Sequence, residues 1–548
     1  MSDIAGFPSH VRANIRVASG ERSDTGLYAL AIATILFFGL LVRLSFTLAS
    51  DFPLNDGGLF YVMVRDLQQA HYALPLYTAY NNAQIPYAYP PLAFYLTAAL
   101  NDITHIDLIT LFRFLPVVLN MLTIVAFAHL SRTLLPSRVA SVGAVFAFTF
   151  LPMAFQWQIM GGGITRALGF ACALALTQQL IRLYRTGQRT YVVTTICLAS
   201  LTVLSHPEAA WFAIYTGTLL WLFLGRNRRG LRHSLLLAAG TLVLTAPWWM
   251  LTVLRHGGAL FRAFGESGFP WYSGLVRLLT LTITVEPGFP VLGGLALVGV
   301  IVCLRRRQFL LVLWIAAVVL FQSRAASQKV VVPLALLAGI GLSDALLPLL
   351  NGQQWSWHGA AVGDTVRKPV ARLATCALAL LLIYVTFAGM AGFREQLGAL
   401  STNDRATSTW VAQNLPPQSR VLVLSPAEWW GTDRSSEWFP VLTGMESVAT
   451  VQGYEWLPGF SRRIERYNLV QHCIWEGPSC VTAWLAATNT SADYVYIAKS
   501  DDGAGRPVAY FESEMNCDGH FRPVYTSASG DIYALSTSGS ALPTRCAR

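Results

Sequence analysis

The sequence predicts an α-helical polytopic membrane protein with a C-terminal extracytoplasmic α/β or α+β domain. The 548 residues are 54% hydrophobic and only 12% charged, which is outside the range of soluble globular proteins. Apolar runs of about 20 residues, the length that crosses a bilayer, recur down to about residue 392 and then stop. The basic residues behind the net charge of +10 are spread over short loops between these runs, so we expect no nucleic-acid partner.

Hydrophobic length and flanking charge predict about eleven spans between residues 27 and 392. They are expected at 27–49, 111–131, 139–156, 165–183, 190–205, 208–225, 234–254, 288–304, 308–322, 330–350 and 370–392. Residues 1–26 are polar, and no small-residue cleavage site follows the first apolar run. We therefore expect a cytoplasmic tail at 1–26, an uncleaved first span, and a terminal domain over 393–548.

Alternate loops are rich in arginine, which orients the expected spans. The basic set comprises Arg12, Arg16, Arg22, Arg132, Arg138, Arg182, Arg185, Arg189, Arg226, Arg228, Arg229, Arg232, Arg305, Arg306, Arg307, Arg367, Lys368 and Arg372. The positive-inside rule places this set and the N-terminus in the cytoplasm. With an odd number of spans in the plasma (inner) membrane, the block 393–548 is extracytoplasmic.

The first outer loop, 50–110, opens with two carboxylates just beyond the end of the first span. Asp51 and Asp56 precede Gly57-Gly58, which allows a tight turn. The apolar side chains that follow at helical spacing are Phe60, Met63, Val64 and Leu67. This pattern predicts a helix in the membrane interface, where a carboxylate can meet both a lipid head group and a soluble partner. The alternatives are that Asp56 only caps this helix and that Asp51 is a solvated loop residue.

The terminal domain holds four of the eight cysteines, which are Cys473, Cys480, Cys517 and Cys546. Four cysteines on an oxidising side suggest two disulfides of undetermined pairing, and a zinc site is the alternative. An amphipathic stretch at 407–415 and strand-like stretches at 420–424, 492–498 and 531–535 predict the mixed fold.

Two loops of this domain, 425–444 and 453–460, place tryptophans next to carboxylates. Tryptophan rings stack on sugar rings and acids bond hydroxyls, so these loops suit carbohydrate. An aromatic seam that docks the domain onto the membrane part explains them equally well.

Ionisable residues also lie at the outer ends of later spans, where they are costly unless they face an aqueous cavity or a ligand. These residues are Arg166, His206, Glu208, Glu286, Arg324 and Lys329. All fall on one side in the predicted topology and could line a single cavity. Arg324 and Lys329 as span-end anchors, and His206 and Glu208 as structural hydrogen-bonding groups, are the alternatives.

Sugar transfer from a polyprenyl-phosphate carrier needs carboxylates and cations of this kind at an outer interface. The lipid phosphate needs Arg or Lys, and the acceptor hydroxyl needs a carboxylate that orients and deprotonates it. Neither a Walker sequence nor a GxGxxG motif is found, and such transfer needs no nucleotide-binding loop.

Three short motifs resemble the GT-C superfamily of membrane glycosyltransferases, in particular the branch of protein O-mannosyltransferases and the aminoarabinose transferase. The stretch 55–61, NDGGLFY, with Arg65 after it, resembles the family's Asp-Glu-x-x-Tyr pattern. The stretch 89–92 matches its YPPL element, and 113–116, RFLP, is similar to the Arg-Leu-Pro that opens the second span. The order of these motifs carries the resemblance, which covers residues 27 to about 350.

The resemblance implies the roles of several residues. Asp56 takes the catalytic position as general base or acceptor-orienting carboxylate, normally with inversion. Gly57 stands where an acidic residue often follows, so Asp51 is a substitute second acid. Arg324 and Lys329 lie where the carrier phosphate is bound, with Arg166 as second choice. Substrate-cavity residues are Tyr61, Arg65, Tyr89, His206, Glu208 and Glu286, although Arg65 is alternatively an interfacial anchor and Tyr89 a wall residue.

A polyprenyl-phosphate-linked sugar, an acceptor of unassigned class and the bilayer are the expected partners. The acidic metal pair of oligosaccharyltransferases is not found in the sequence, so no obligatory cofactor is expected and a divalent metal stays an open alternative. A transporter of lipid-linked saccharides is the competing function, although neither an internal repeat nor paired broken helices is found. A non-catalytic glycan-binding membrane protein is the third hypothesis.

Overall fold

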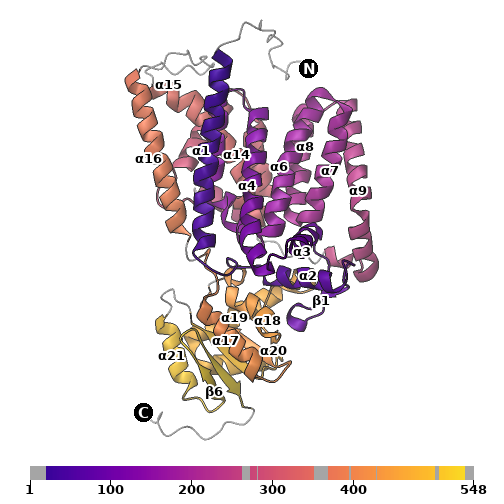
Figure 1. Ribbon diagram of the computed structural model, residues 1–548, viewed down its shortest axis with the longest axis vertical. Helices are drawn as coiled ribbons and strands as arrows, with labels where there is room; N and C mark the ends of the chain where they lie inside the picture. Colours follow the sequence, from indigo (N-terminus) through magenta and orange to yellow (C-terminus); the bar gives the residue numbers. More distant parts are fainter. Residues whose placement is uncertain are drawn as a thin grey trace.

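The computed structural model is a helical bundle with a smaller α/β part attached to one end (Figure 1). It describes residues 20–261, 272–280, 282–350, 368–393, 396–427, 429–499 and 505–536, with the side chains of 20–24, 368–375 and 505–507 left out. Cys546, Arg12, Arg16 and Arg367 lie outside the described residues.

A helix lies on each of the eleven predicted spans. They are α1 (Gly20–Leu48), α4 (Leu108–Leu134), α5 (Arg138–Phe150), α6 (Gly163–Thr186), α7 (Arg189–Ser205), α8 (Pro207–Leu224), α9 (Arg228–His256), α12 (Val291–Arg305), α13 (Leu310–Phe321), α14 (Ala326–Gly341) with its extension η5 (Leu342–Leu346) and α15 (Leu347–Leu350), and α16 (Lys368–Gly392). A short helix, α11 (Ser273–Leu279), lies between α9 and α12.

Length and composition separate these helices into two groups. Among the described residues, five helices are long and apolar enough to cross a membrane, or six if the bent pair 138–150 and 152–158 is one span. Several others are shorter apolar helices of 10–17 residues. The protein is thus an integral membrane protein by its helices, and the count of about eleven spans stays a prediction.

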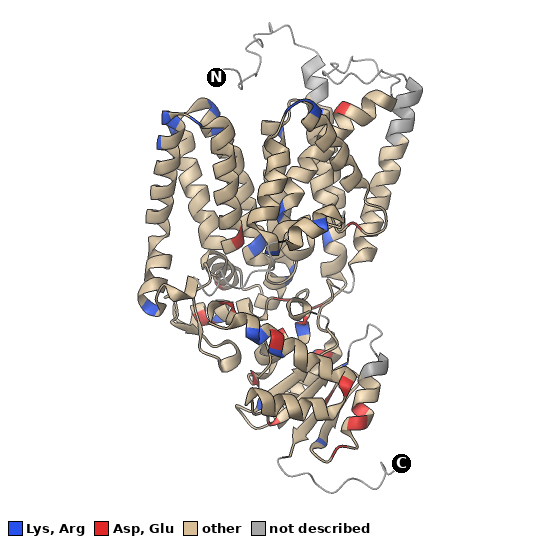
Figure 2. Ribbon diagram, turned by 180° about the vertical axis from the view of Figure 1, so that it is seen from behind, with Lys and Arg blue, Asp and Glu red and all other residues tan. Residues whose placement is uncertain are grey.

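The arginine-rich loops and the α/β part lie at opposite ends of the bundle (Figure 2). Arg132 and Arg138 flank the connection from α4 to α5, and Arg226 and Arg228 flank the one from α8 to α9. Both connections lie at the end of the bundle where α1 begins (Figure 1). The positive-inside rule expects such a concentration of arginines at the cytoplasmic end of a membrane protein. The side of the membrane on which each end lies remains a prediction.

A buried arginine links three helices of the bundle through hydrogen bonds. Arg43 of α1 is fully buried, its Nε donates to Asn120 Oδ1 of α4 at 2.5 Å, and Nη2 donates to the Thr149 carbonyl of α5 at 3.2 Å. Asn120 in turn donates to the carbonyl of Ala154, in the turn η2 (Pro152–Ala154) after α5. Hydrogen bonding of this kind offsets the cost of a charge at membrane depth and fixes the break in α5. That break leads into η3 (Gln156–Gln158) and then the glycines before α6.

The first outer loop forms α2 (Gly58–Gln69), a short hairpin of β1 (Tyr77–Thr78) and β2 (Ile85–Pro86) around η1 (Tyr80–Asn82), and α3 (Leu92–Thr104). Helices α2 and α3 lie across the end of the bundle (Figure 1). The apolar face of α2 exists as predicted, but it is buried inside the protein. Met63, Val64 and Leu67 pack with Phe94 of α3 and Phe112 of α4. The expected contact with lipid is therefore replaced by contact with protein.

The C-terminal part is a five-stranded mixed sheet in the order β4-β3-β5-β7-β6, with helices on both faces. Its strands are β3 (Arg420–Leu424), β4 (Glu446–Ser447), β5 (Tyr494–Ala498), β6 (Phe521–Thr526) and β7 (Gly530–Leu535). Its helices are α17 (Thr402–Asn414), α18 (Arg434–Thr443), α19 (Phe460–Glu476), α20 (Pro478–Thr488) and α21 (Gly505–Met515). The predicted strands at 420–424, 492–498 and 531–535 correspond to β3, β5 and β7.

One predicted disulfide is present between described residues, joining Cys473 of α19 to Cys480 of α20. Cys517 is also disulfide-bonded. The described cysteines of the bundle, Cys172, Cys197, Cys303 and Cys376, are free.

We expect Cys473→Ser to lower the free energy of unfolding by about 2–3 kcal/mol, because cross-linking a short loop removes that much chain entropy from the unfolded state. The two cysteines are seven residues apart in sequence. Thermal unfolding with and without reductant measures the effect, and Cys376→Ser is the control that should leave it unchanged. A wild-type protein that is insensitive to reductant would contradict the expectation.

Candidate active site

The site begins where the first outer loop is clamped between the bundle and the C-terminal part. Leu54 accepts a hydrogen bond from the Gly161 amide at 2.9 Å, and the Asn55 amide donates to the Gly398 carbonyl at 2.8 Å. The buried Trp438 of α18 donates from its indole to the Asn55 carbonyl at 2.9 Å. Three separate stretches of chain therefore fix the backbone immediately before Asp56.

Asp56 lies at the N-terminus of α6. Its Oδ1 accepts from the Gly162 amide at 2.8 Å, and its Oδ2 forms an ion pair with Arg166 Nη2 at 2.7 Å. A helix N-terminus and a guanidinium both favour the ionised carboxylate. The helix that follows Asp56 in sequence, α2, is capped by Gly57 without a side-chain bond, so Asp56 does not cap it.

The glycines at 161–163 allow Asp56 to come close to the N-terminus of α6. A Cβ on Gly161 would lie 2.1 Å from the Asp56 carbonyl oxygen. A Cβ on Gly162 would lie 3.0 Å from Asp56 Oδ2. Gly57, at φ +117°, packs against the same glycines. The two glycine runs are therefore one contact between the first loop and α6.

We expect Gly161→Ala to lower the activity of this site at least tenfold, because the added methyl displaces the Asp56 backbone. Forcing one extra carbon into a packed site typically costs about 1–3 kcal/mol. Gly294→Ala is the matched control, since a Cβ there meets nothing within 4 Å. Rates of the two variants, compared at equal folded fraction, make the test, and an unimpaired Gly161→Ala would contradict it.

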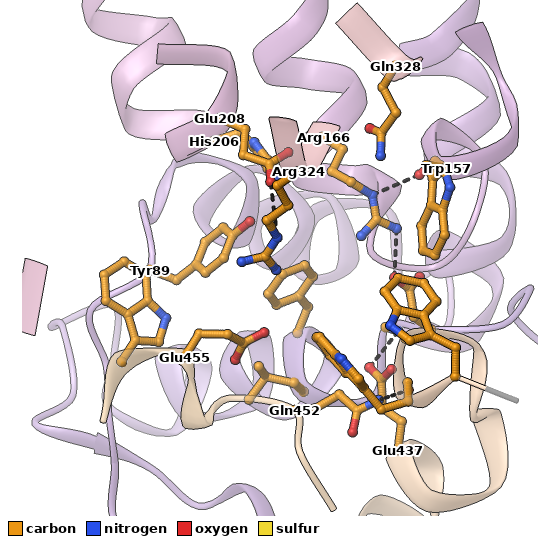
Figure 3. Close-up of a pocket in the computed structure, with 18 residues that line it drawn as sticks. Tyr89, Trp157, Arg166, His206, Glu208, Arg324, Gln328, Glu437, Gln452 and Glu455 are labelled. Carbon is orange, nitrogen blue, oxygen red and sulfur yellow. Dashed lines mark hydrogen bonds and ion pairs between the residues drawn. The ribbon is translucent and has the colours of Figure 1, made fainter. Parts of the chain in front are cut away.

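Asp56 opens into a cavity of about 160 Å³ between the bundle and the C-terminal part (Figure 3). Its charged and polar walls are formed by Asp56, Arg166, His206, Glu208, Arg324, Gln328, Glu437, Gln452 and Glu455. Its aromatic walls are formed by Phe60, Tyr89, Trp157, Trp429, Trp430 and Trp456. A space lined by charged groups and several tryptophans suits a ligand that combines an anion with sugar rings.

Two arginines face this cavity from the bundle. Arg166 is held by Asp56 and by its own Nε–H bond to the Trp157 carbonyl at 2.7 Å. Arg324, in the turn η4 (Ser323–Ala325) before α14, lies 3.5 Å from Glu208, and its side chain is 28% exposed. Burial raises the pKa of Glu455 across the cavity, and the charge of Arg324 partly offsets the rise. Arg324 is thus the better exposed of the two cations in the cavity.

The third predicted cation is not in the cavity wall. Lys329 is buried in α14, with its Nζ 4.3 Å from the centre of the Phe170 ring. Its neighbour Gln328 lines the cavity in its place.

His206 and Glu208 are wall residues, and His206 Nδ1 is buried without a hydrogen-bond partner among the described residues. Tyr89 lies between the His206 and Trp456 rings, each with its centre 6.0 Å from that of Tyr89.

Four other predicted residues lie outside the cavity. The Asp51 side chain is 65% exposed and pairs with Arg405 at 2.5 Å. Arg65 is on the exposed face of α2, and Tyr61 packs between the Phe112 and Trp438 rings. Glu286 accepts hydrogen bonds from the amides of residues 292 and 293 and so caps α12.

Sequence reasoning missed Glu437, the acid that the C-terminal part places beside Asp56. Its Oε1 accepts from the Gly57 amide at 2.8 Å, and its side chain is buried in the cavity wall. The only signal was the tryptophan-rich stretch 425–444, which we interpreted as either a carbohydrate loop or a docking seam. In the structure this stretch does both: Trp438 docks on the first outer loop, and Trp429 and Trp430 line the cavity.

Among the residues that the structure describes, no group of three or more His, Cys, Asp or Glu side chains gathers as a metal site does. Asp56 and Glu437 each already bind backbone amides, and Asp56 also binds Arg166.

Three solved membrane proteins share this architecture over most of the chain. The archaeal oligosaccharyltransferase AglB from Archaeoglobus fulgidus, in complex with an inhibitory peptide and a dolichol-phosphate, has TM-score 0.54 and 13% identity, covering 92% of this chain and 74% of AglB. ArnT from Cupriavidus metallidurans, bound to undecaprenyl phosphate, has TM-score 0.52 and 13% identity over 95% and 100%. The chain has the GT-C fold.

A third GT-C structure, the arabinofuranosyltransferase AftD from mycobacteria, has TM-score 0.53 and 15% identity over 94% of this chain but 40% of AftD. Searches of protein-family models and of curated proteins find no match. At these identities the likeness concerns the fold, and at that level it confirms the resemblance seen in the sequence motifs.

Proposed function

We propose that this protein is a membrane glycosyltransferase. It moves a sugar from a polyprenyl-phosphate carrier to an acceptor hydroxyl at the extracytoplasmic face. The observation that carries the proposal is the cavity of a GT-C fold in which Asp56 is held by Arg166 and the α6 N-terminus, and in which Arg324 also forms part of the wall. AglB and ArnT were solved with dolichol-phosphate and undecaprenyl phosphate respectively, which supports a lipid-linked donor.

In the proposed reaction the acceptor oxygen attacks C1 of the sugar on the side opposite the phosphate, giving inversion. The bond from C1 to the phosphate oxygen breaks, and its electron pair leaves with the phosphate. The hydroxyl proton passes to Asp56, which is the general base. Arg324 binds the departing phosphate, because a guanidinium matches phosphate geometry and charge.

The fixed position of Asp56 favours this role. Its two oxygens are each held by one donor, so the carboxylate direction is set before the acceptor enters. The tryptophans 157, 429, 430 and 456 supply ring faces on which a sugar can stack. The arginine-rich loops lie at the far end of the bundle, which by the positive-inside rule supports a cavity on the extracytoplasmic side.

Release of the carrier phosphate tests the function. Purified protein in sealed proteoliposomes is given polyprenyl-phosphate sugars with and without candidate hydroxyl acceptors. The proposal predicts free polyprenyl phosphate and glycosylated acceptor in equal amounts. Donor that moves between leaflets with its sugar intact would identify a transporter, and binding without consumption would identify a glycan-binding protein. Either result would overturn the proposal.

A further inference from the structure

We propose that Glu437 is a second acid of this site, which stays protonated during transfer and donates its hydrogen bond to a substrate hydroxyl in the cavity. The inference rests on the proposed function and adds to it a residue from the C-terminal part. On this inference the site is complete only when the C-terminal part is docked on the bundle.

The position of Glu437 argues for this role. Its Oε1 accepts the Gly57 amide at the start of α2, just as Asp56 accepts Gly162 at the start of α6. Each acid therefore caps a helix that belongs to another segment. Its main-chain carbonyl accepts from the Tyr80 hydroxyl at 2.8 Å, which fixes this end of α18 against the first outer loop. A Cβ on Gly58 would lie 2.9 Å from that same carbonyl oxygen, so the packing is tight.

Burial and the charge of Asp56 oppose the ionisation of Glu437, whereas the amides of Gly57 and Leu59 and the charge of Arg166 favour it. Asp56 faces it from the loop before α2, Arg166 from α6 and Tyr80 from η1. Arg166 is already paired with Asp56, so its charge is largely neutralised. On its own helix, Asp433 bonds Ser436 and Tyr467, and across the cavity Glu208 and Glu455 face Arg324. Burial and the Asp56 charge raise the pKa of Glu437 to about 8.

A neutral carboxyl group fits the chemistry of the site better than a further negative charge. The donor brings a phosphate into a cavity that already contains ionised Asp56, and a further anion would repel it. A protonated Glu437 keeps Oε1 as acceptor for Gly57 and offers an O–H to the ligand. Sugar and acceptor hydroxyls can accept that bond without any charge being added.

The pH dependence of transfer by wild type and by Glu437→Gln tests this inference. Glutamine keeps an acceptor for Gly57 and a donor toward the cavity, but it does not titrate. Wild type should lose about tenfold in rate between pH 7 and pH 9, because a group with a pKa of about 8 is mostly ionised at pH 9. Glu437→Gln should keep activity within about threefold at pH 7 and change less than twofold up to pH 9.

Two results would overturn the inference. An inactive but folded Glu437→Gln would mean that the carboxylate itself is needed, and an unchanged alkaline decline would mean that Glu437 only caps α2. Glu446→Gln, on the same part but paired with Arg420, is the control and should follow wild type. If wild type itself releases no carrier phosphate, the proposed function fails instead, so the two failures are distinguishable.

Discussion

Asp56→Asn is expected to lower the transfer rate by about a thousandfold, the middle of the range for removing a general base. The asparagine oxygen can still accept the Gly162 amide, so the loop should keep its place. Donor binding should change little, since Arg324 and the aromatic walls are untouched. Single-turnover rates and donor binding, measured on the same preparation, separate the two effects.

The Asp56 test needs two controls. Removing the Asp56 charge leaves Arg166 buried without its counter-ion, which can cost several kcal/mol of stability, so thermal unfolding is measured alongside. Asp51→Asn is the matched variant, because Asp51 is exposed and pairs with Arg405 outside the cavity. It should stay within about twofold of wild type. A folded Asp56→Asn that transfers sugar at the wild-type rate would refute its role as base.

Arg324→Ala is expected to weaken donor binding about 30-fold or more. Losing one partner of a largely desolvated charge pair costs about 2–5 kcal/mol, and 2 kcal/mol corresponds to about a 30-fold change in affinity. The measured quantity is the dissociation constant for polyprenyl phosphate, which carries the anion without the sugar. Unlike Asp56→Asn, this variant should change binding more than the rate at saturating donor.

Arg65→Ala is the control for the Arg324→Ala substitution. Arg65 is exposed on α2 and lies outside the cavity, so it reports the general effect of removing an arginine near the bundle end. It should bind polyprenyl phosphate as wild type does. Equal affinities of Arg324→Ala and wild type would place the carrier phosphate elsewhere.

Periodicity and hydrophobic length predicted most of the bundle, because those signals are local. A helix lies on each predicted span, although the span expected at 139–156 is bent by 80° after Phe150, and β3 begins and ends at the predicted residues. The environment of α2 differs from the prediction. Its apolar residues do lie on one face of the helix, but helical spacing alone does not show whether lipid or protein covers that face.

The site was only partly predictable, because its parts meet through tertiary contacts. Asp56 was found from its place in a motif, and Arg166, Arg324, His206 and Glu208 from charge at span ends, and all line one cavity. Glu437 is 381 residues from Asp56 in sequence, and only the docking of α18 onto the first loop brings them together. Asp51 follows the first span just as Asp56 does, but its side chain is 65% exposed and pairs with Arg405 outside the cavity.

A structure of the protein with polyprenyl phosphate bound tests the central claim most directly. The phosphate should lie in the cavity beside Arg324, on the same wall as Glu208, with Asp56 facing the position that the sugar C1 would occupy. A phosphate at the arginine-rich end of the bundle, beside Arg132 or Arg229, would contradict the assignment of both the site and the side of the membrane.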